Sequence, residues 1–342
     1  MRITSQYVTN SMIRYVQTNL SNLAISQEQI ATTKRVNRPS DDPNILSPLL
    51  AIKGNLAYNE QYSRNLDDGL AYLDVSDSTM GSMGDVLKKA YEYAEQAAND
   101  TYSSDQRKAV AVQIDKLIDQ MVDFGNAAVG SKYVFAGKEN SNPPFKRITD
   151  ADGKECIIFM GDTEKVEREV AAHTSYPINA TSAGFGVDGL GNPVPEGAFG
   201  WARDDAMQTI SGVTGQVLYK EGGADGDFSG LFKELFELKN ALNDDSDPDQ
   251  QQKIEVSIGD LQEVMDRVLQ HRVAVGSRYN QFEDMKKQLL NQNISLEGTM
   301  STLEDADMSK LSILVAQQML TYQASLAVGT NMLKTSLLDY LR

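Results

Sequence analysis

The chain has 342 residues, of which 41% are hydrophobic, and this length suffices for two or three packed units. Its net charge of −16 leaves no dominant basic surface, which argues against nucleic acid as a partner. The single cysteine, Cys156, excludes an intrachain disulfide. No segment is long and apolar enough to span a membrane, and Met1 to Tyr15 lacks the pattern of a cleaved secretory signal. We therefore expect no membrane partner, and any export must use a route without a cleaved signal.

The N-terminal segment carries apolar residues at alternating steps of three and four, which predicts an amphipathic helix of about three heptads. This helix must end before Pro39 and Pro43, because two prolines so close together cannot continue it. Asp41 or Asp42 then caps a second helix, with Pro43 in its first turn. A carboxylate pair for acid–base chemistry is the alternative interpretation, and capping is the simpler one. The apolar face of the first helix consists of Ile13, Val16, Leu20, Leu23 and Ile30.

Two further helices are predicted before residue 130. The second helix runs toward Ala98, with Gly81 and Gly84 weakening its middle, and a third helix follows a polar break at 99–103. The apolar face of the second helix consists of Leu66, Leu70, Leu73, Met80, Leu87 and Tyr91, and that of the third consists of Val110, Ile114, Leu117, Met121, Phe124 and Ala128.

The character of the chain changes after Gly130. Segment 146–170 predicts β structure, with Asp152 and Gly153 as a hairpin turn signal. Segment 184–230 contains 12 of the 25 glycines, which is typical of loops and short strands.

Two patterns in this region imitate ligand sites. The glycines of 184–189 spell the dinucleotide fingerprint G-x-G-x-x-G, but Pro193 and Pro195 exclude the helix that must follow it. Residues 150–153 begin like a calcium loop, yet Lys154 stands where a ligand belongs. We interpret the first pattern as a chance match and the second as a hairpin turn.

Residues suited to catalysis or metal binding are scarce. The two histidines, His173 and His271, lie in different segments without the cysteine or carboxylate spacing of a metal site. Cys156 is expected to be a buried strand residue and not a nucleophile. We therefore expect no cofactor, no metal and no enzymatic activity.

Helix returns near 228–242, and a longer helical rod follows it. The apolar seam of this rod steps by four and three over about five heptads, and only Arg272 and Lys286 interrupt it. A helix from Asp249 to Gln292 would be roughly 65 Å long, a length typical of a spacer or an assembly surface. The seam consists of Ile254, Ile258, Leu261, Met265, Val268, Val275, Tyr279, Phe282 and Leu289.

The C-terminal segment, 302–341, is apolar on more than one side. A two-stranded seam buries two positions per heptad, so the second side predicts further neighbours such as other copies or related subunits. Ordering a free arm costs about 1–2 kcal/mol per residue, and we expect 1–42 and 300–342 to be mobile in the monomer and to fold together on assembly. One side consists of Leu311, Val315, Met319, Tyr322, Leu326, Leu333 and Leu337, and the other of Ile313, Leu314, Leu320, Val328, Met332 and Leu338.

Short motifs at both ends resemble those of one family. Residues 33–43 read Thr-Lys-Arg-Val-Asn-Arg-Pro-Ser-Asp-Asp-Pro, which resembles the N-terminal signature of flagellins and flagellar hook-associated proteins. Residues 275–280, 304–307 and 336–341 resemble the C-terminal signature of the same family. Each piece is short, but their joint order across both ends is specific.

A further set of residues resembles the FlgL-type branch of this family, the hook–filament junction proteins. Residues 159–162, 169–170 and Asn179 fit the β segment that follows in that branch. The residues of the branch motif are Tyr133, Phe135, Ala136 and Gly137, with Phe145 shortly after them.

The resemblance implies an elongated α+β fold, in which both ends build a long antiparallel helical coiled coil or bundle around a β-rich insertion. It implies a terminal helical assembly domain of 1–42 with 300–342. A helical rod domain would comprise 43–145 with 228–299, and 146–227 would form an outward β-rich domain.

The resemblance also implies a structural, non-enzymatic adaptor between the flagellar hook and the flagellin filament. Such a protein is extracellular, sits in a ring of its own copies, and contacts flagellin and a second hook-associated junction protein. It passes the export apparatus without a cleaved signal after an export chaperone has bound its C-terminal helix. A flagellin filament subunit is the alternative. A needle-type secretion protein or a coiled-coil chaperone is a rival of another class, against which the paired end signatures argue.

The resemblance finally implies assembly contacts and charge pairs near the two end signatures. The basic residues Lys34, Arg35 and Arg38 are a solvated face by default, and under the resemblance they pair with acids of 304–307, Arg38 with Asp305 among them. The implied assembly residues are Arg35, Asn37, Pro39, Ser40, Asp41, Asp42, Pro43, Arg278, Asp305, Asp307, Leu326, Leu333, Leu337 and Leu338.

Overall fold

The computed structural model describes residues 2–99, 102–179, 184–185, 197–202, 208–223, 228–244 and 248–340. The chain divides into two compact units. The first, which we call the terminal unit, consists of Met1–Glu60 and Leu290–Arg342, and the second, the central unit, is Gln61–Leu289. The finer division into three domains stays a prediction.

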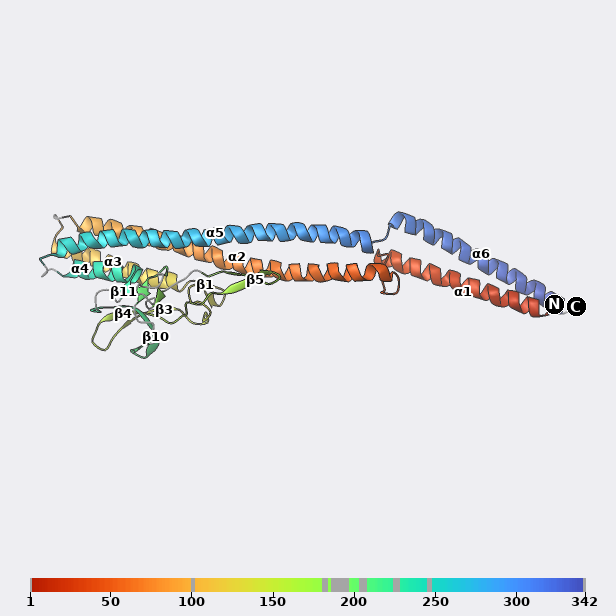
Figure 1. Ribbon diagram of the computed structural model, residues 1–342, viewed down its shortest axis with the longest axis horizontal. Coiled ribbons are helices and arrows are strands. Elements are labelled where there is room, and N and C mark those ends of the chain that lie inside the picture. Colours follow the sequence, from red (N-terminus) through yellow and green to blue (C-terminus); the bar gives the residue numbers. More distant parts are fainter. Residues whose placement is uncertain are drawn as a thin grey trace. The chain divides into compact units, whose positions relative to one another are not determined.

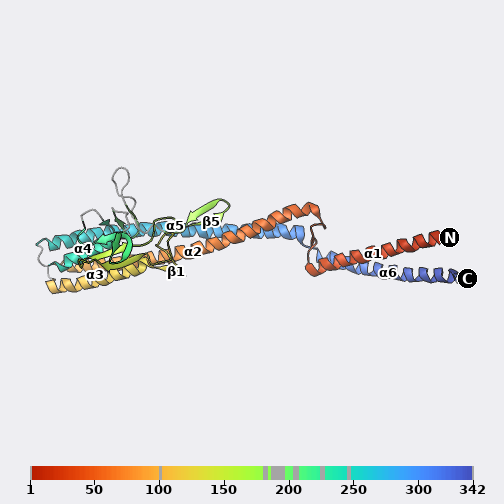
Figure 2. The same ribbon diagram turned by 90° about the horizontal axis from the view of Figure 1, so that it is seen from below.

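Two long helices make up most of the terminal unit. Helices α1 (Arg2–Thr32) and α6 (Met308–Tyr340) run side by side in opposite directions, so both chain ends lie at the same end of the pair (Figure 1 and Figure 2). The side-chain amide of Asn19 donates to Ser325 Oγ at 2.9 Å and fixes one point of their register. The amphipathic helix predicted at the N-terminus is confirmed.

The terminal unit also contains the beginning of α2 (Pro43–Ala97) and the end of α5 (Gln250–Glu304). Between them, Asn59 Nδ2 donates to Asn293 Oδ1 at 2.8 Å. Helix α5 is the predicted helical rod, and it is longer than the expected span of Asp249 to Gln292, because it continues to Glu304. Helix α6 begins at Met308.

In the central unit, α2 and α5 run antiparallel, and α3 (Ser104–Gly125) and α4 (Leu231–Asn243) pack against each other beside them (Figure 1). Two pairs mark the register of α2 and α5. Lys286 forms an ion pair with Asp67 at 2.5 Å, and Arg272 binds Asp77 at 3.0 and 3.2 Å. The two interruptions of the apolar seam are therefore cations that pair with α2.

Helix α2 is continuous through the glycines expected to weaken it. A Cβ on Gly81 would lie 3.3 Å from Arg272 Cζ, so this glycine makes room for the guanidinium group. Helix α3 begins with a capping box, in which Ser103 and Gln106 each bond the other's backbone N–H.

Short strands form several sheets in the described part of the central unit. The main sheet is antiparallel with the strand order β3-β4-β10-β9, and it has a bulge between Val217 and Tyr219. A second sheet has the strand order β11-β8-β7, and in it β7 and β8 are parallel. The hairpin predicted at Asp152 and Gly153 is confirmed as the β3–β4 turn. The strands are β1 (Ala128–Val129), β2 (Lys132–Tyr133), β3 (Phe145–Thr149), β4 (Glu155–Phe159), β5 (Glu167–Ala171), β6 (Thr174–Pro177), β7 (Gly184–Phe185), β8 (Trp201–Ala202), β9 (Gln208–Ile210), β10 (Val213–Lys220) and β11 (Phe228–Ser229).

An aromatic cluster joins this sheet to the helices. The Phe145 ring lies 5.1 Å from that of Phe159, 4.5 Å from that of Phe199 and 5.8 Å from that of Phe232, measured between centroids. All four side chains are almost completely buried. The α+β class, with long helices at both ends of the chain and mostly antiparallel sheets between them, is confirmed. Within the described residues, no helix combines the length and apolarity that crossing a bilayer requires.

Candidate assembly surfaces and the motifs that support them

The signature at 33–43 forms an ordered connector between α1 and α2. The carboxylate of Asp41 accepts the backbone N–H of Asn37 at 2.9 Å and of Arg38 at 2.7 Å, so it closes the turn around Pro39. Asp42 Oδ1 accepts the N–H of Asn44 at 3.2 Å and caps α2. The predicted capping is confirmed for Asp42, while Asp41 holds the connector itself.

The second signature, 304–307, lies directly beside this connector. Lys34 and Asp305 form an antiparallel β-bridge, and the N–H of Arg35 donates to the carbonyl of Glu304 at 2.7 Å. The Arg35 guanidinium group donates to the carbonyl of Leu303 at 3.0 Å. The structure thus brings the N-terminal signature together with one of the three pieces of the C-terminal signature, 304–307.

Glu304 is the carboxylate at which the side chains of this region meet. Its Oε1 lies 2.8 Å from Lys34 Nζ and 2.8 Å from Lys53 Nζ. Burial alone would raise the pKa of Glu304, but the hydrogen bonds from the two ammonium groups outweigh it and hold the pKa below its usual value. Lys53 was not among the predicted site residues, because it lies a helical stretch away from the signature that it completes.

The other charged residues of the two signatures have partners that differ from the expected ones. Arg38 binds Glu28 at 3.0 Å, and Asp305 accepts the hydroxyl of Ser301, so the Arg38–Asp305 pair is wrong. Asp307 caps α6, since its Oδ1 accepts the N–H groups of both Ser309 and Lys310 at 3.1 Å. Those hydrogen bonds lower the pKa of Asp307.

About half of the large apolar side chains in the described part of the terminal unit are exposed. In α6, Leu326 is 42% exposed and Leu320 is 68% exposed, although both belong to the predicted apolar faces. The predicted residues Leu333, Leu337 and Leu338 lie in α6, and their side chains are outside the described part. Pairing with α1 therefore covers one side of α6 only. Further exposed apolar residues are Tyr7, Ile13, Tyr15, Leu20, Ile25, Leu50, Tyr58, Leu290, Ile294, Ile313, Leu314, Met319 and Val328.

The branch motif forms an interlocked turn in the central unit. The carboxylate of Asp162 accepts the backbone N–H of Lys138, Glu139 and Glu164 at 2.8 to 3.0 Å, and the N–H of Asp162 donates to the carbonyl of Ala136 at 2.9 Å. Gly137 has a φ of +75°, and a Cβ there would lie 2.2 Å from the Asp162 carbonyl oxygen. The motif therefore needs glycine at this position.

The remaining motif residues fill the core beside this turn. Phe135 and Ala136 are fully buried, and the Phe135 ring meets that of Phe199 edge-on at 5.1 Å. Phe145 opens β3 within the aromatic cluster, and the carbonyl of Tyr133 accepts the Tyr72 hydroxyl at 3.0 Å. These contacts give the motif a structural role in the central unit, and any direct role in assembly stays a prediction.

Arg278 holds a loop of the same unit. Its guanidinium group donates to the carbonyl of Asn179 at 2.8 Å. The Asn179 side chain in turn accepts the N–H of Val166 at 3.0 Å and donates to the carbonyl of Glu164 at 2.9 Å. Arg278 was predicted as an assembly residue, and the structure shows this supporting contact.

A group of charged side chains joins α3, α4 and the sheet. Arg147 binds Asp115 at 2.5 Å, Asp119 at 2.7 Å and Glu155 at 2.6 Å, and Lys239 also contacts Asp115 and Glu155. Burial raises the pKa of Asp115, but the hydrogen bonds of Arg147 and Lys239 outweigh it and lower the pKa overall. Both cations also lie over the ring of Phe236, at 5.4 and 5.1 Å from its centroid.

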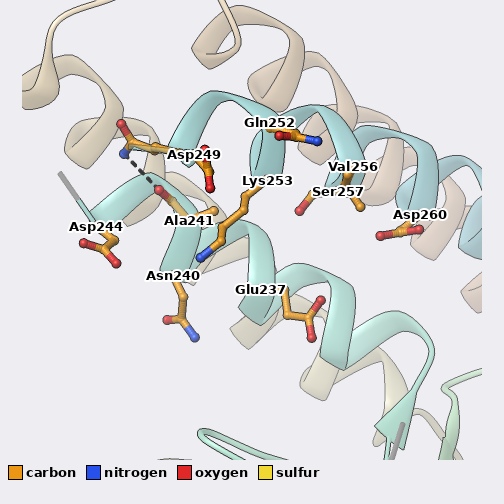
Figure 3. A pocket seen from close by; sticks show the side chains of 11 residues that line it. Glu237, Asn240, Ala241, Asp244, Asp249, Gln252, Lys253, Val256, Ser257 and Asp260 are labelled. Carbon is orange, nitrogen blue, oxygen red and sulfur yellow. Dashed lines mark hydrogen bonds between the residues drawn. The ribbon is translucent and has the colours of Figure 1, made fainter. Parts of the chain in front are cut away.

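A groove lies between α4 and the start of α5 (Figure 3). Its lining carries the acids Glu237, Asp244, Asp249 and Asp260, together with Lys253. No group of three histidine, cysteine or carboxylate side chains able to hold a metal ion occurs among the described residues.

The other sequence patterns have simple structural explanations where they are described. Cys156 is buried in β4, and burial raises the pKa of its thiol. The turn residues Asp150 and Gly153 close the β3–β4 hairpin, and Lys220 pairs with Asp150 at 2.7 Å. The fingerprint at 184–189 lies largely outside the described residues.

Sequence comparisons relate the chain to flagellar proteins. Residues 3–140 match the family described as the bacterial flagellin N-terminal helical region. Flagellar hook-associated protein 3 of Escherichia coli K12 is 25% identical over 342 residues, which cover 98% of each chain. The protein of the same name from Salmonella typhimurium is 26% identical over 57% of this chain and 60% of its own length.

Solved structures show the same fold. A hook-associated protein structure from Vibrio parahaemolyticus, described as putative, superposes with a TM-score of 0.59 at 15% identity and covers 78% of this chain and 100% of that one. The Xanthomonas campestris FlgL crystal structure in space group C2 has a TM-score of 0.53 at 20% identity, with 73% of this chain and 99% of that chain covered.

Proposed function

Because this chain is a hook-associated member of the flagellin family, of the FlgL type, we propose that it forms the structural adaptor layer between the flagellar hook and the flagellin filament. The resemblance seen in the end signatures and the branch motif is confirmed by the full-length similarity to flagellar hook-associated protein 3. Its place is the flagellum, and its partners are other axial proteins of that structure.

One observation supports an adaptor above all. The two terminal helices pair with each other and still expose large apolar side chains on their outer faces, such as Tyr15 in α1 and Leu320 in α6, each 68% exposed. A helix pair with exposed apolar faces is stabilised when it packs against further helices. An axial layer of the flagellum supplies such neighbours on both sides.

The finer features of this role rest on the same surfaces. Copies of the chain form a ring, in which the outer faces of α1 and α6 contact neighbouring copies, flagellin and a second hook-associated junction protein. Before export, a chaperone covers the apolar sides of α6, and the chain then passes the export apparatus without a cleaved signal. The assembled protein lies outside the cell at the hook–filament junction, and its role is structural and not enzymatic.

Deletion of the gene in its own bacterium tests the proposal. We expect bare hooks in electron micrographs and soluble flagellin in the medium, because filament subunits are exported but find no platform. Loss of flagellin itself would make this chain the filament subunit. Intact motile filaments would contradict both roles, after a second gene copy has been excluded by sequencing. Re-expression of the chain restores filaments in the expected case.

A further inference from the structure

The two connectors of the terminal unit are tied to each other at one buried carboxylate. The first connector, 33–42, links α1 to α2, and the second, 305–307, links α5 to α6. Glu304 is only 4% exposed, and its Oε1 accepts from both Lys34 Nζ and Lys53 Nζ at 2.8 Å. A single oxygen atom thus joins the end of α5, the first connector and α2.

Backbone hydrogen bonds cross between the connectors at the same place. The N–H of Arg35 donates to the carbonyl of Glu304 at 2.7 Å, and the N–H of Ala306 donates to the carbonyl of Thr33 at 3.0 Å. The first connector is therefore bonded through its backbone both to the last residue of α5 and to the second connector. Thr33, at the end of α1, has a φ of +59°, an uncommon conformation that the surrounding contacts must maintain.

We propose that Glu304, Lys34 and Lys53 form a clasp that makes the two connectors a single hinge, with Glu304 as its positioning residue. The negative charge holds two ammonium groups that would otherwise repel each other. Loss of that charge releases both lysines at once, and the two crossing backbone hydrogen bonds open together. The clasp forms in the free subunit, so the end of α1 and the start of α6 are held next to each other there. Its value for building an axial layer rests on the proposed function.

Amide hydrogen exchange of the full-length chain, followed by nuclear magnetic resonance, tests the clasp directly. The reporters are the Arg35 and Ala306 amides, because the first bonds across to the end of α5 and the second bonds across to the first connector. We expect both to be protected in the unsubstituted chain, and Glu304→Gln to reduce their protection by the same factor. The amides of Asn37 and Arg38 bond to Asp41 within one connector, and their protection stays unchanged.

Matched variants separate the clasp from a general loss of structure. Asp305→Asn alters the neighbouring carboxylate, which bonds Ser301, and leaves the Arg35 and Ala306 amides protected. The charge exchange of Glu304→Lys with Lys34→Glu and Lys53→Glu restores the protection that Glu304→Gln removes. Unprotected reporter amides in the unsubstituted chain, different factors for the two amides, or a failed charge exchange would each overturn the proposal. None of these readouts depends on filament formation, so the deletion experiment tests the function separately.

Discussion

Two independent features require glycine at position 137, the backbone conformation and the lack of space for a side chain. Its φ of +75° favours glycine, and a Cβ would lie 2.2 Å from the carbonyl oxygen of Asp162. We expect Gly137→Ala to lower the unfolding free energy of the central unit by about 2–4 kcal/mol. Gly153 is the matched control, since its φ is +81° but no atom lies within 4 Å of its Cβ position. Gly153→Ala should cost only about 1 kcal/mol. Urea unfolding followed by circular dichroism measures both, and equal costs would contradict the steric argument.

Glu234 in α4 makes the stability of the central unit depend on pH. Its pKa is raised from 4.5 to about 7, mainly by burial. Lys233 lowers this pKa, whereas the nearby acids Glu237 and Asp260 raise it. The charged carboxylate therefore penalises the folded state above pH 7, and the penalty disappears as the pH falls to 4.5, where the unfolded chain is protonated too.

Glu234→Gln removes this penalty. We expect it to stabilise the central unit at pH 8 by at most about 3 kcal/mol, and the gain to vanish near pH 4. Thermal unfolding at several pH values measures the difference. The same change at the exposed Glu92 serves as the control and should alter little at any pH. A gain that does not depend on pH would show that the charge of Glu234 is not its cause.

At the scale of elements, the packing of α3 and α4 on the sheet depends on the charged group around Phe236. Lys239→Met leaves Arg147 alone with the carboxylates of Asp115 and Glu155. These groups are 15–28% exposed, so we expect a loss of about 1–3 kcal/mol, less than for a fully buried pair.

The control for this change is Lys116→Met, which removes an ion pair with Asp119 in which the two side chains are 67% and 46% exposed. Such a surface pair contributes about 0–1 kcal/mol. Denaturant titrations at low and high salt separate the two variants, because added salt screens the exposed pair more strongly. Similar losses for both would mean that the charged group does not support the packing.

The sequence predicted these elements where the periodicity was regular and local. The apolar seams predicted the long helices, and the Asp152–Gly153 signal predicted the hairpin. Each pattern depends only on residues that lie close together in the chain. The partners of Arg272 and Lys286 were not predictable, because they depend on how α2 and α5 align. The Glu304 clasp was found only in part, since Lys53 has no pattern of its own. The break between α5 and α6 was not predicted, because 304–307 contains neither glycine nor proline to mark the end of a helix.

At the scale of the whole chain, the terminal helices differ from the central unit in what stabilises them. From Leu311 to Leu333 the sequence contains no charged residue, and most large apolar side chains described there are exposed. Ordering these helices costs about 1–2 kcal/mol per residue, which one thin seam between α1 and α6 recovers poorly. We therefore propose that both helices are mobile in the free subunit up to the clasp and become ordered on assembly.

Limited proteolysis of the free and the assembled protein tests this difference. Trypsin finds no site between Leu311 and Leu333, so chymotrypsin is the suitable protease. In the free chain we expect cleavage of α1 and α6 first, since the clasp protects both connectors. The resistant fragment should begin after Leu23, the last chymotrypsin site of α1, and end at Met308 or Leu311, the first sites of α6. In isolated hook–filament junctions the same sites should be cut slowly. Cleavage within the central unit gives the reference rate in each sample. Terminal helices as resistant as the central unit in the free chain would show that they need no partner to fold.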